Sequence, residues 1–231
     1  DVTNGVLYYK KTGSATNTGW QKFYPSSYIE DADTDTKIQT EESADEDKIR
    51  FDLAGTEHFV MERGSGVARL EVLGNGKTIA IGDQAGATDD GTNNANIFIG
   101  DGAGDGTATG TSNVAIGENA LGAAAATFSD NIAIGTGAKQ ATTAGTRNVD
   151  IGTSASNNST GGTYNVNVGY SAAVNNAAGD NNVVIGALAG TGVAATSYSN
   201  NVFVGYEAGK GATTTTSSTV FVGVSAGQVN T

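Results

Sequence analysis

Nine copies of one short pattern follow one another along the last two thirds of the chain. In each copy a β-branched residue, a variable residue and a second β-branched residue precede a glycine, and an alanine stands three residues after it. A missed repeat leads to a wrong fold, so this pattern is the first constraint on the architecture. The copies read TIAIGDQA, NIFIGDGA, NVAIGENA, NIAIGTGA, NVDIGTSA, NVNVGYSA, NVVIGALA, NVFVGYEA and TVFVGVSA, with glycines at Gly82, Gly100, Gly117, Gly135, Gly152, Gly169, Gly186, Gly205 and Gly223, spaced by 17 to 19 residues.

Each position of the repeat predicts a place in a strand or a turn. Two β-branched residues at a spacing of two lie on one face of a strand, and we expect this face to point inward and the variable residue between them to point outward. The glycine is expected to end the strand where φ is positive or a neighbouring backbone is close. The constant alanine indicates a tight internal position. Asparagine opens seven copies, and a hydrogen-bonded ladder between coils is expected from Asn96, Asn113, Asn131, Asn148, Asn165, Asn182 and Asn201.

The repeat predicts an all-β fold, a parallel β-solenoid of nine coils. A unit of ~17–18 residues with one strong strand cannot bury its own apolar face, so the units must stack. The second half of each unit consists mostly of Ala, Thr, Gly, Ser and Asn, and the whole chain has 34 Gly. Such a roll is thin, and too little apolar surface is available to stabilise it alone. We therefore expect chains to associate, as a homotrimer.

A family resemblance follows from these segments. NVAIGENA and NIAIGTGA resemble the head repeats of trimeric autotransporter adhesins, whose consensus is close to N-S-V-A-I-G-x-x-A. The longer unit, with Thr109-Gly110 or Gly161-Gly162 in its second half, is similar to repeats of phage tail fibres and of large surface proteins from marine Bacteroidetes. The resemblance covers residues 77–231. It implies a left-handed parallel β-roll within a trimer.

The first 76 residues differ in composition and hold the only Trp, Pro, His and Met of the chain. Two aromatic-rich runs, 5–11 and 20–24, predict a β-hairpin in a first segment, 1–25. A second segment, 26–76, is expected to be β-rich, with strands over 37–40, 48–52, 56–62 and 67–73. We expect this module to initiate the trimer and to cap the solenoid that occupies 77–231, because an uncovered strand edge invites uncontrolled pairing.

Composition argues against several classes of partner and site. The 12 basic residues face 24 acidic ones, giving a net charge of −12, which disfavours binding to nucleic acid. No apolar run is long enough to insert into a membrane. The chain has no Cys, so disulfides and thiolate metal sites are excluded.

No residue pattern predicts catalysis, a cofactor or a metal. His58 is the only histidine, so it has no second His or Cys with which to form a nucleophilic dyad. The solenoid acids are interpreted as scattered over different columns and coils, unlike the paired carboxylates of a glycosidase: Asp83, Asp101, Glu118 and Asp150. The glycine-rich string DGAGDG lacks the features of a phosphate loop.

One acidic stretch resembles a calcium loop. Asp31, Asp33 and Asp35 are followed by Glu42 at the twelfth place, but Thr36 stands where an EF-hand needs glycine. The flanking residues also indicate strands, not helices. A solvated acidic turn is therefore expected there.

Five aromatic residues are candidates for a binding surface. Phe98, Phe203 and Phe221 share the variable strand position, and Tyr170 and Tyr206 follow their repeat glycines. Exposed aromatic rings stack on sugars or on partner proteins. The alternative is that these rings form buried contacts between chains.

The function expected first is a structural segment of a phage tail fibre, located on the virion and acting as a spacer and a receptor-binding rod. Its partners would be two further copies of the chain, other fibre or baseplate proteins, and a host surface glycan or protein. The alternative is a trimeric adhesin of the bacterial cell surface, or a subunit of an extracellular filament. Ice binding is disfavoured, because Thr213 to Thr216 is a local run and not a column across coils.

Overall fold

The computed structural model describes residues 77–228 apart from 91, 93, 108, 123–126, 142–143, 193–196 and 214–215, and it describes strand segments before residue 77. Every regular element in these residues is a β-strand. The chain divides into two compact units, Asp1–Leu73 and Gly74–Thr231. Each unit is considered by itself.

The first unit contains two antiparallel sheets. One has three strands, β1 (Val2–Thr3), β2 (Val6–Lys10) and β3 (Trp20–Lys22). The other has five strands in sequence order, namely β4 (Tyr28–Glu30), β5 (Lys37–Gln39), β6 (Lys48–Leu53), β7 (Thr56–Arg63) and β8 (Ala68–Val72). The strands β2, β3 and β5 to β8 overlap the ranges that the sequence predicts, whereas β1 and β4 are not predicted. The capping and trimer-initiating role of this unit stays a prediction.

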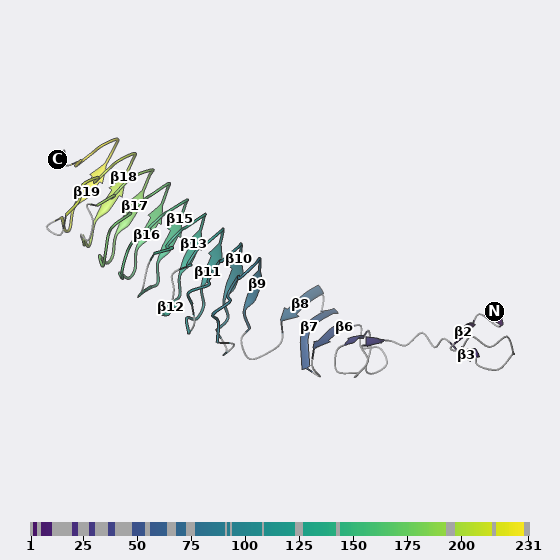
Figure 1. The fold of residues 1–231 in the computed structure, drawn as a ribbon. Helices are drawn as coiled ribbons and strands as arrows, with labels where there is room; N and C mark the ends of the chain where they lie inside the picture. Colours follow the sequence, from purple (N-terminus) through teal and green to yellow (C-terminus); the bar gives the residue numbers. More distant parts are fainter. Residues whose placement is uncertain are drawn as a thin grey trace. The chain divides into compact units, whose positions relative to one another are not determined.

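The second unit is a parallel β-solenoid, as the repeat predicts (Figure 1). Each of the nine repeats contributes one three-residue strand to a single parallel sheet, and each strand pairs with the strand of the next repeat. These strands are β9 (Ile79–Ile81), β10 (Ile97–Ile99), β11 (Val114–Ile116), β13 (Ile132–Ile134), β15 (Val149–Ile151), β16 (Val166–Val168), β17 (Val183–Ile185), β18 (Val202–Val204) and β19 (Val220–Val222). A short parallel pair, β12 (Thr127–Ser129) with β14 (Ala144–Thr146), lies outside that sheet.

The strands pair without any register shift, so every repeat position forms a column along the solenoid. Phe98 pairs with Ala115, for example, and Ala115 pairs with Ala133. The repeat glycines then lie one above another. At Gly117, φ is +128°, and a Cβ would lie 2.7 Å from the carbonyl carbon of Gly135 in the next coil. Both predicted reasons for glycine, a positive φ and a close neighbouring backbone, therefore hold.

The asparagine ladder is also confirmed. The backbone N–H and the Nδ2 of Asn148 both donate to Oδ1 of Asn131, at 3.0 and 3.2 Å. Nδ2 of Asn148 also donates to the carbonyl oxygen of Gly162 at 3.0 Å, which ties the strand to a later part of the chain. Its own Oδ1 accepts the same pair of bonds from Asn165. The side chain thus has all of its polar capacity used inside a buried column, where an unsatisfied group would be costly.

The prediction of which strand face points inward is wrong. The middle residue of each strand faces the interior, and Phe98, Ala115 and Val184 have no exposed surface. The β-branched residues on either side of it point outward. The physical reason is the width of the roll: the constant alanines, buried as predicted at most coils, leave room for only one side chain from each strand.

The interior is filled by matching large residues with small ones. The ring of Phe98 lies against Gly86 and Gly104, and a Cβ at either glycine would come within 3 Å of it. Each of these glycines stands four residues after the repeat glycine of its coil. Where the strand centre is Ala115 or Ala133, the facing position holds a large buried side chain instead, Leu121 or Lys139. In these coils and in that of Phe98, one large side chain fills the interior.

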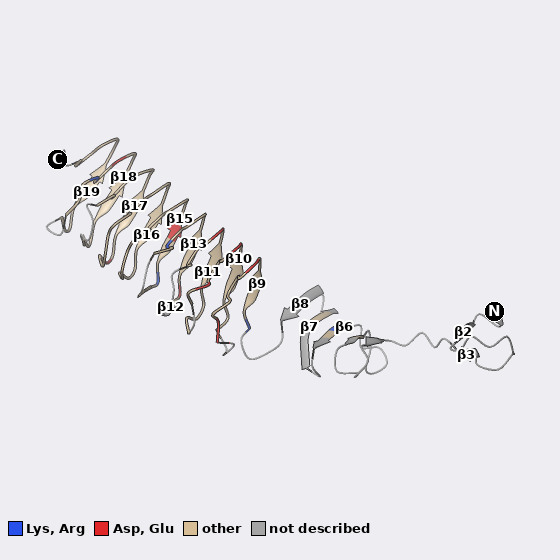
Figure 2. Ribbon diagram, viewed as in Figure 1, with Lys and Arg blue, Asp and Glu red and all other residues tan. Residues whose placement is uncertain are grey.

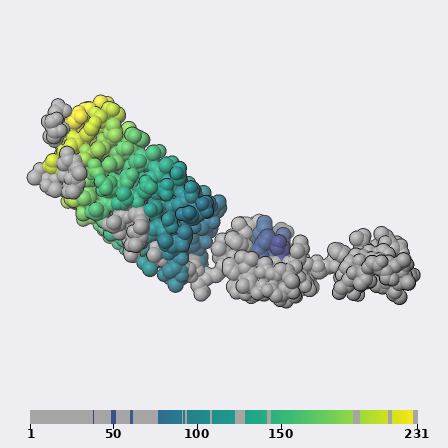
Figure 3. Space-filling view, in the orientation of Figure 1, coloured from purple at the N-terminus to yellow at the C-terminus, as the bar shows by residue number. Residues whose placement is uncertain are grey.

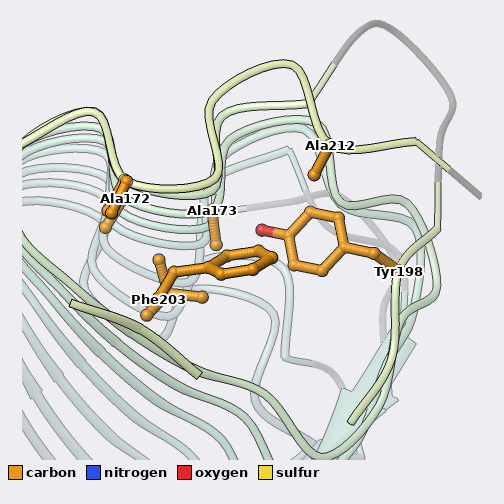
Figure 4. Packing of buried hydrophobic residues seen from close by; sticks show 8 residues of the cluster. Ala172, Ala173, Tyr198, Phe203 and Ala212 are labelled. Carbon is orange, nitrogen blue, oxygen red and sulfur yellow. The ribbon is translucent and has the colours of Figure 1, made fainter. Parts of the chain in front are cut away.

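Near the C-terminal end an aromatic cluster fills the interior. Figure 4 shows Phe203 and Tyr198 pointing into the space beside Ala172, Ala173 and Ala212. The ring centroids of Tyr198 and Phe203 are 5.4 Å apart. The hydroxyl of Tyr198 donates to the carbonyl oxygen of Gly190 at 2.6 Å, and burial raises the pKa of this phenol.

We predict that Gly117→Ala destabilises the solenoid by about 3 kcal/mol or more, because it combines a strained φ with overlap onto the next coil. The matched control is Gly161→Ala, where the nearest atom to a new Cβ, that of Ala178, lies at 3.8 Å. Urea unfolding followed by circular dichroism measures both. Equal midpoints for the two variants would show that the coils are not in backbone contact at the glycine column.

Candidate interaction surface

The outward side chains of the nine parallel strands form one apolar surface, here called the Ile/Val face. It consists of the first and last residue of every strand, and each of these residues is Ile or Val. Ile99, Ile116 and Ile151 are each 36 % exposed, and the terminal Val220 is 68 % exposed. The members are Ile79, Ile81, Ile97, Ile99, Val114, Ile116, Ile132, Ile134, Val149, Ile151, Val166, Val168, Val183, Ile185, Val202, Val204, Val220 and Val222.

The Ile/Val face is continuous and carries no polar side chain. Adjacent strands are about 4.8 Å apart, so nine strands extend the face over roughly 40 Å. Apolar patches of this extent on soluble proteins mark sites of protein contact. The face therefore has the apolar chemistry of an interaction surface.

A second row runs beside this face and is called the edge row. It comprises the residues that directly follow the repeat glycines: Asp83, Asp101, Glu118, Thr136, Thr153, Tyr170, Ala187, Tyr206 and Val224. The reading of the acids as belonging to different columns is wrong for three of them, because Asp83, Asp101 and Glu118 share this row and are exposed. Among the described residues, no three His, Asp or Glu are grouped so that they could hold a metal ion.

The structure separates the five aromatic candidates. Tyr170 and Tyr206 are 58 % and 50 % exposed, as a binding role requires. The prediction of an outward position is wrong for Phe98 and Phe203, which are fully buried. Phe221 is half-buried and stacks on Phe203, with ring centroids 5.4 Å apart. The cause is the reversed strand facing described above.

Tyr170 and Tyr206 lie in the edge row two coils apart, with a coil that carries Ala187 between them. Two strand spacings correspond to about 10 Å along the solenoid. The small alanine leaves both rings accessible. The geometry is compatible with two contact points on one extended ligand.

A third exposed aromatic residue was not singled out by the sequence. Tyr164 is exposed, and the guanidinium carbon of Arg147 lies 5.6 Å from its ring centroid. Arg147 also approaches Asp130, with Nε to Oδ2 at 3.7 Å. The side chains of Tyr164, Arg147 and Asp130 are all exposed to solvent, so their interactions contribute little to the stability of the fold. Its residues lie outside the strand pattern, which is why the repeat does not reveal it.

The start of the solenoid has its own polar cap. Asp90 accepts hydrogen bonds from the backbone N–H and the hydroxyl of Thr92 and from Nδ2 of Asn94. These bonds lower the pKa of Asp90. Nδ2 of Asn94 also donates to Asp89, whose other carboxylate oxygen lies 3.4 Å from Nδ2 of Asn96. The carboxylate of Asp89 thus accepts a hydrogen bond from Asn96, the first amide of the asparagine ladder.

Several sequence-based interpretations fall outside what is described. Asp31, Asp33, Asp35 and Glu42 lie outside the described residues, as does the side chain of His58. Within the described part of the chain, no helix has the length and apolar character needed to span a membrane. No known protein family, curated protein or solved structure matches the chain. Function therefore has to be argued from the geometry.

Proposed function

We propose that this chain is a structural segment of an extracellular trimeric fibre, in the first place a phage tail fibre. It would act as a spacer and as a receptor-binding rod. The observation that carries the proposal is the Ile/Val face. A trimeric adhesin of the bacterial surface, or an extracellular filament subunit, is the alternative that the same face supports.

The Ile/Val face is best covered by further copies of the same chain. Full burial of one Val or Ile side chain contributes roughly 1.5–3 kcal/mol, and each strand offers two that are only partly buried. A second copy has columns with the same spacing, so its side chains match along the whole length. A different partner would need to reproduce that spacing.

Three copies suit the shape of the face better than two. Each three-residue strand offers a strip only two side chains wide. Three such strips can face a common axis and enclose a narrow apolar core on all sides, and closed symmetric assemblies of this type leave no unused face. The resemblance of the repeat segments to those of trimeric adhesins and tail fibres also favours three copies.

The solenoid also has the properties of a spacer. Every coil is joined to the next by strand hydrogen bonds, and the coils from Asn96 to Asn201 also by the asparagine ladder, so length grows with the number of coils. The edge row then runs along the side of the rod, and its exposed Tyr170 and Tyr206 are the candidate contacts with a host glycan or protein.

We predict that the protein is a trimer in solution and that the double variant Ile116→Lys with Ile151→Lys is a monomer. Two lysines on the face would bury unpaired charges in the trimer core, which costs several kcal/mol per ion. Native mass spectrometry and sedimentation measure the mass. Ala178→Lys is the control, because Ala178 is exposed and lies outside the nine strands.

The double variant should keep the circular dichroism of the parent if its coils remain folded. A parent that is a stable monomer at micromolar concentration would contradict the proposed interface. A stable dimer would contradict the proposed number of copies.

For the biological role, we predict that antibodies against residues 77–228 label thin fibres that project from phage tails. Immunogold electron microscopy of the source material gives the answer directly. Labelling confined to a cell envelope would reject the phage assignment and favour the adhesin.

For the receptor role, we predict that Tyr170→Ala with Tyr206→Ala lowers attachment of the purified rod to host cells about tenfold. Stacking of a ligand on one aromatic ring contributes roughly 0.5–1.5 kcal/mol in addition to the burial of apolar surface. Flow cytometry of labelled protein measures attachment. Thr136→Ala with Thr153→Ala, in the same row, is the matched control. Unchanged attachment of the tyrosine variant would remove these rings from the binding surface.

A further inference from the structure

Among the described residues, the interior of the solenoid holds one charged pair. Lys139 stands at the position that carries Leu121 in the preceding coil, and its side chain is 1 % exposed. Asp150 occupies the centre of β15, where its side chain is 0 % exposed, and Asn167 occupies the centre of β16. Figure 2 shows the acidic residue of β15 among strands that are otherwise uncharged. The three residues come from three successive repeats.

The contacts of this trio are uneven. Nζ of Lys139 lies 3.4 Å from Oδ2 of Asp150, yet this oxygen has no hydrogen-bond partner. Oδ1 of the same carboxyl accepts a short hydrogen bond from Nδ2 of Asn167, at 2.7 Å. The amine is thus beside the carboxyl group but not aligned in a hydrogen bond with it. Two reacting groups that are held side by side lose less translational and rotational entropy on reaction than groups that must first meet by diffusion.

Both side chains of the pair are buried, so the ion pair carries a desolvation cost. Burying two ions costs several kcal/mol each, and good hydrogen bonds are needed to offset this. Transfer of one proton from Lys139 to Asp150 gives a neutral amine and a neutral carboxylic acid. In water, the hydration of the two ions opposes their condensation. Both side chains are at most 1 % exposed, so they are removed from bulk water.

We propose that Lys139 and Asp150 form an intramolecular amide bond. After the proton transfer, the lone pair of Nζ attacks Cγ of Asp150, and the C–N bond forms while the carbonyl electrons move to Oδ1. Oδ2 then leaves as water, carrying its own proton and one from Nζ, and Oδ1 becomes a carbonyl oxygen again. The reaction is a condensation without oxidant or reductant, and it releases one water molecule.

Asn167 stabilises the step. Its Nδ2 already donates to Oδ1 of Asp150, which is the oxygen that becomes negative when the amine attacks. A donor placed in advance at such an oxygen, in a site shielded from bulk solvent, lowers the barrier. The product is a covalent link between successive coils in the middle of the rod, in addition to the asparagine ladder that already joins them.

The test is the mass of the folded protein after complete denaturation. We expect a chain lighter by one water molecule than its sequence, and a tryptic digest in which cleavage after Lys139 is lost and Lys139 is joined to Asp150. Lys210 and Glu207 supply an internal control, with Nζ 2.5 Å from Oε1 but partly exposed to solvent. Cleavage after Lys210 should continue.

Lys139→Met should restore the full mass, because it removes the amine and keeps a long side chain in the cavity. Asn167→Ala should slow the loss of water after refolding, at least tenfold, without changing its site. A parent chain of full mass with free Lys139 overturns the proposal. A chain that loses ammonia and links Lys139 to Asn167, or one that still loses water as Lys139→Met, overturns it equally.

Discussion

The close approach of successive backbones at the repeat glycines is the constraint on which the solenoid depends. A Cβ at Gly117 would overlap the carbonyl of Gly135, so the coils touch backbone to backbone there. This contact fixes the strand register along the sheet. It also brings each asparagine within hydrogen-bonding distance of the next, as Asn131 and Asn148 show. Directional bonds and steric contact thus impose the same coil spacing.

The same constraint explains why the apolar face is on the outside. Coils that stack this closely around small alanines enclose a space for one strand side chain each, and Phe98 or Val184 already fills it. The β-branched pairs must then point away from their own chain. A solenoid of this width cannot bury them unaided, which is the physical basis of the proposed association.

The sequence predicts the columns well and their facing poorly. Glycine, alanine and asparagine each fill positions that restrict which residue can stand there, and their recurrence over the repeats shows this in the sequence. Which face of a strand points inward cannot be predicted in this way. The side chains of a three-residue strand alternate between the two faces identically, whichever face is buried. The free variation at the strand centre resembled an exposed position. The combination of a large residue, Phe98, at the strand centre with glycine at the facing positions, Gly86 and Gly104, indicates that the strand centre is internal.

Residues that occur in one coil only were the hardest to foresee. Tyr198 and Lys139 are side chains that no other repeat has at the same interior position, and periodicity carries no information about them. The sequence does single out Asp150, because it is the only acidic residue within the nine strands. Its partner could be identified only from coordinates.

The matching of interior volumes limits how such a chain can lengthen during evolution. Phe98 requires glycine at the facing position both in its own coil and in the coil before it. Copying a single coil and inserting it elsewhere would often place a ring against Leu121 or Lys139. Recombination between genes for rods of this type should therefore preserve blocks of two or three neighbouring coils, and boundaries between blocks should coincide with coils whose interiors are interchangeable.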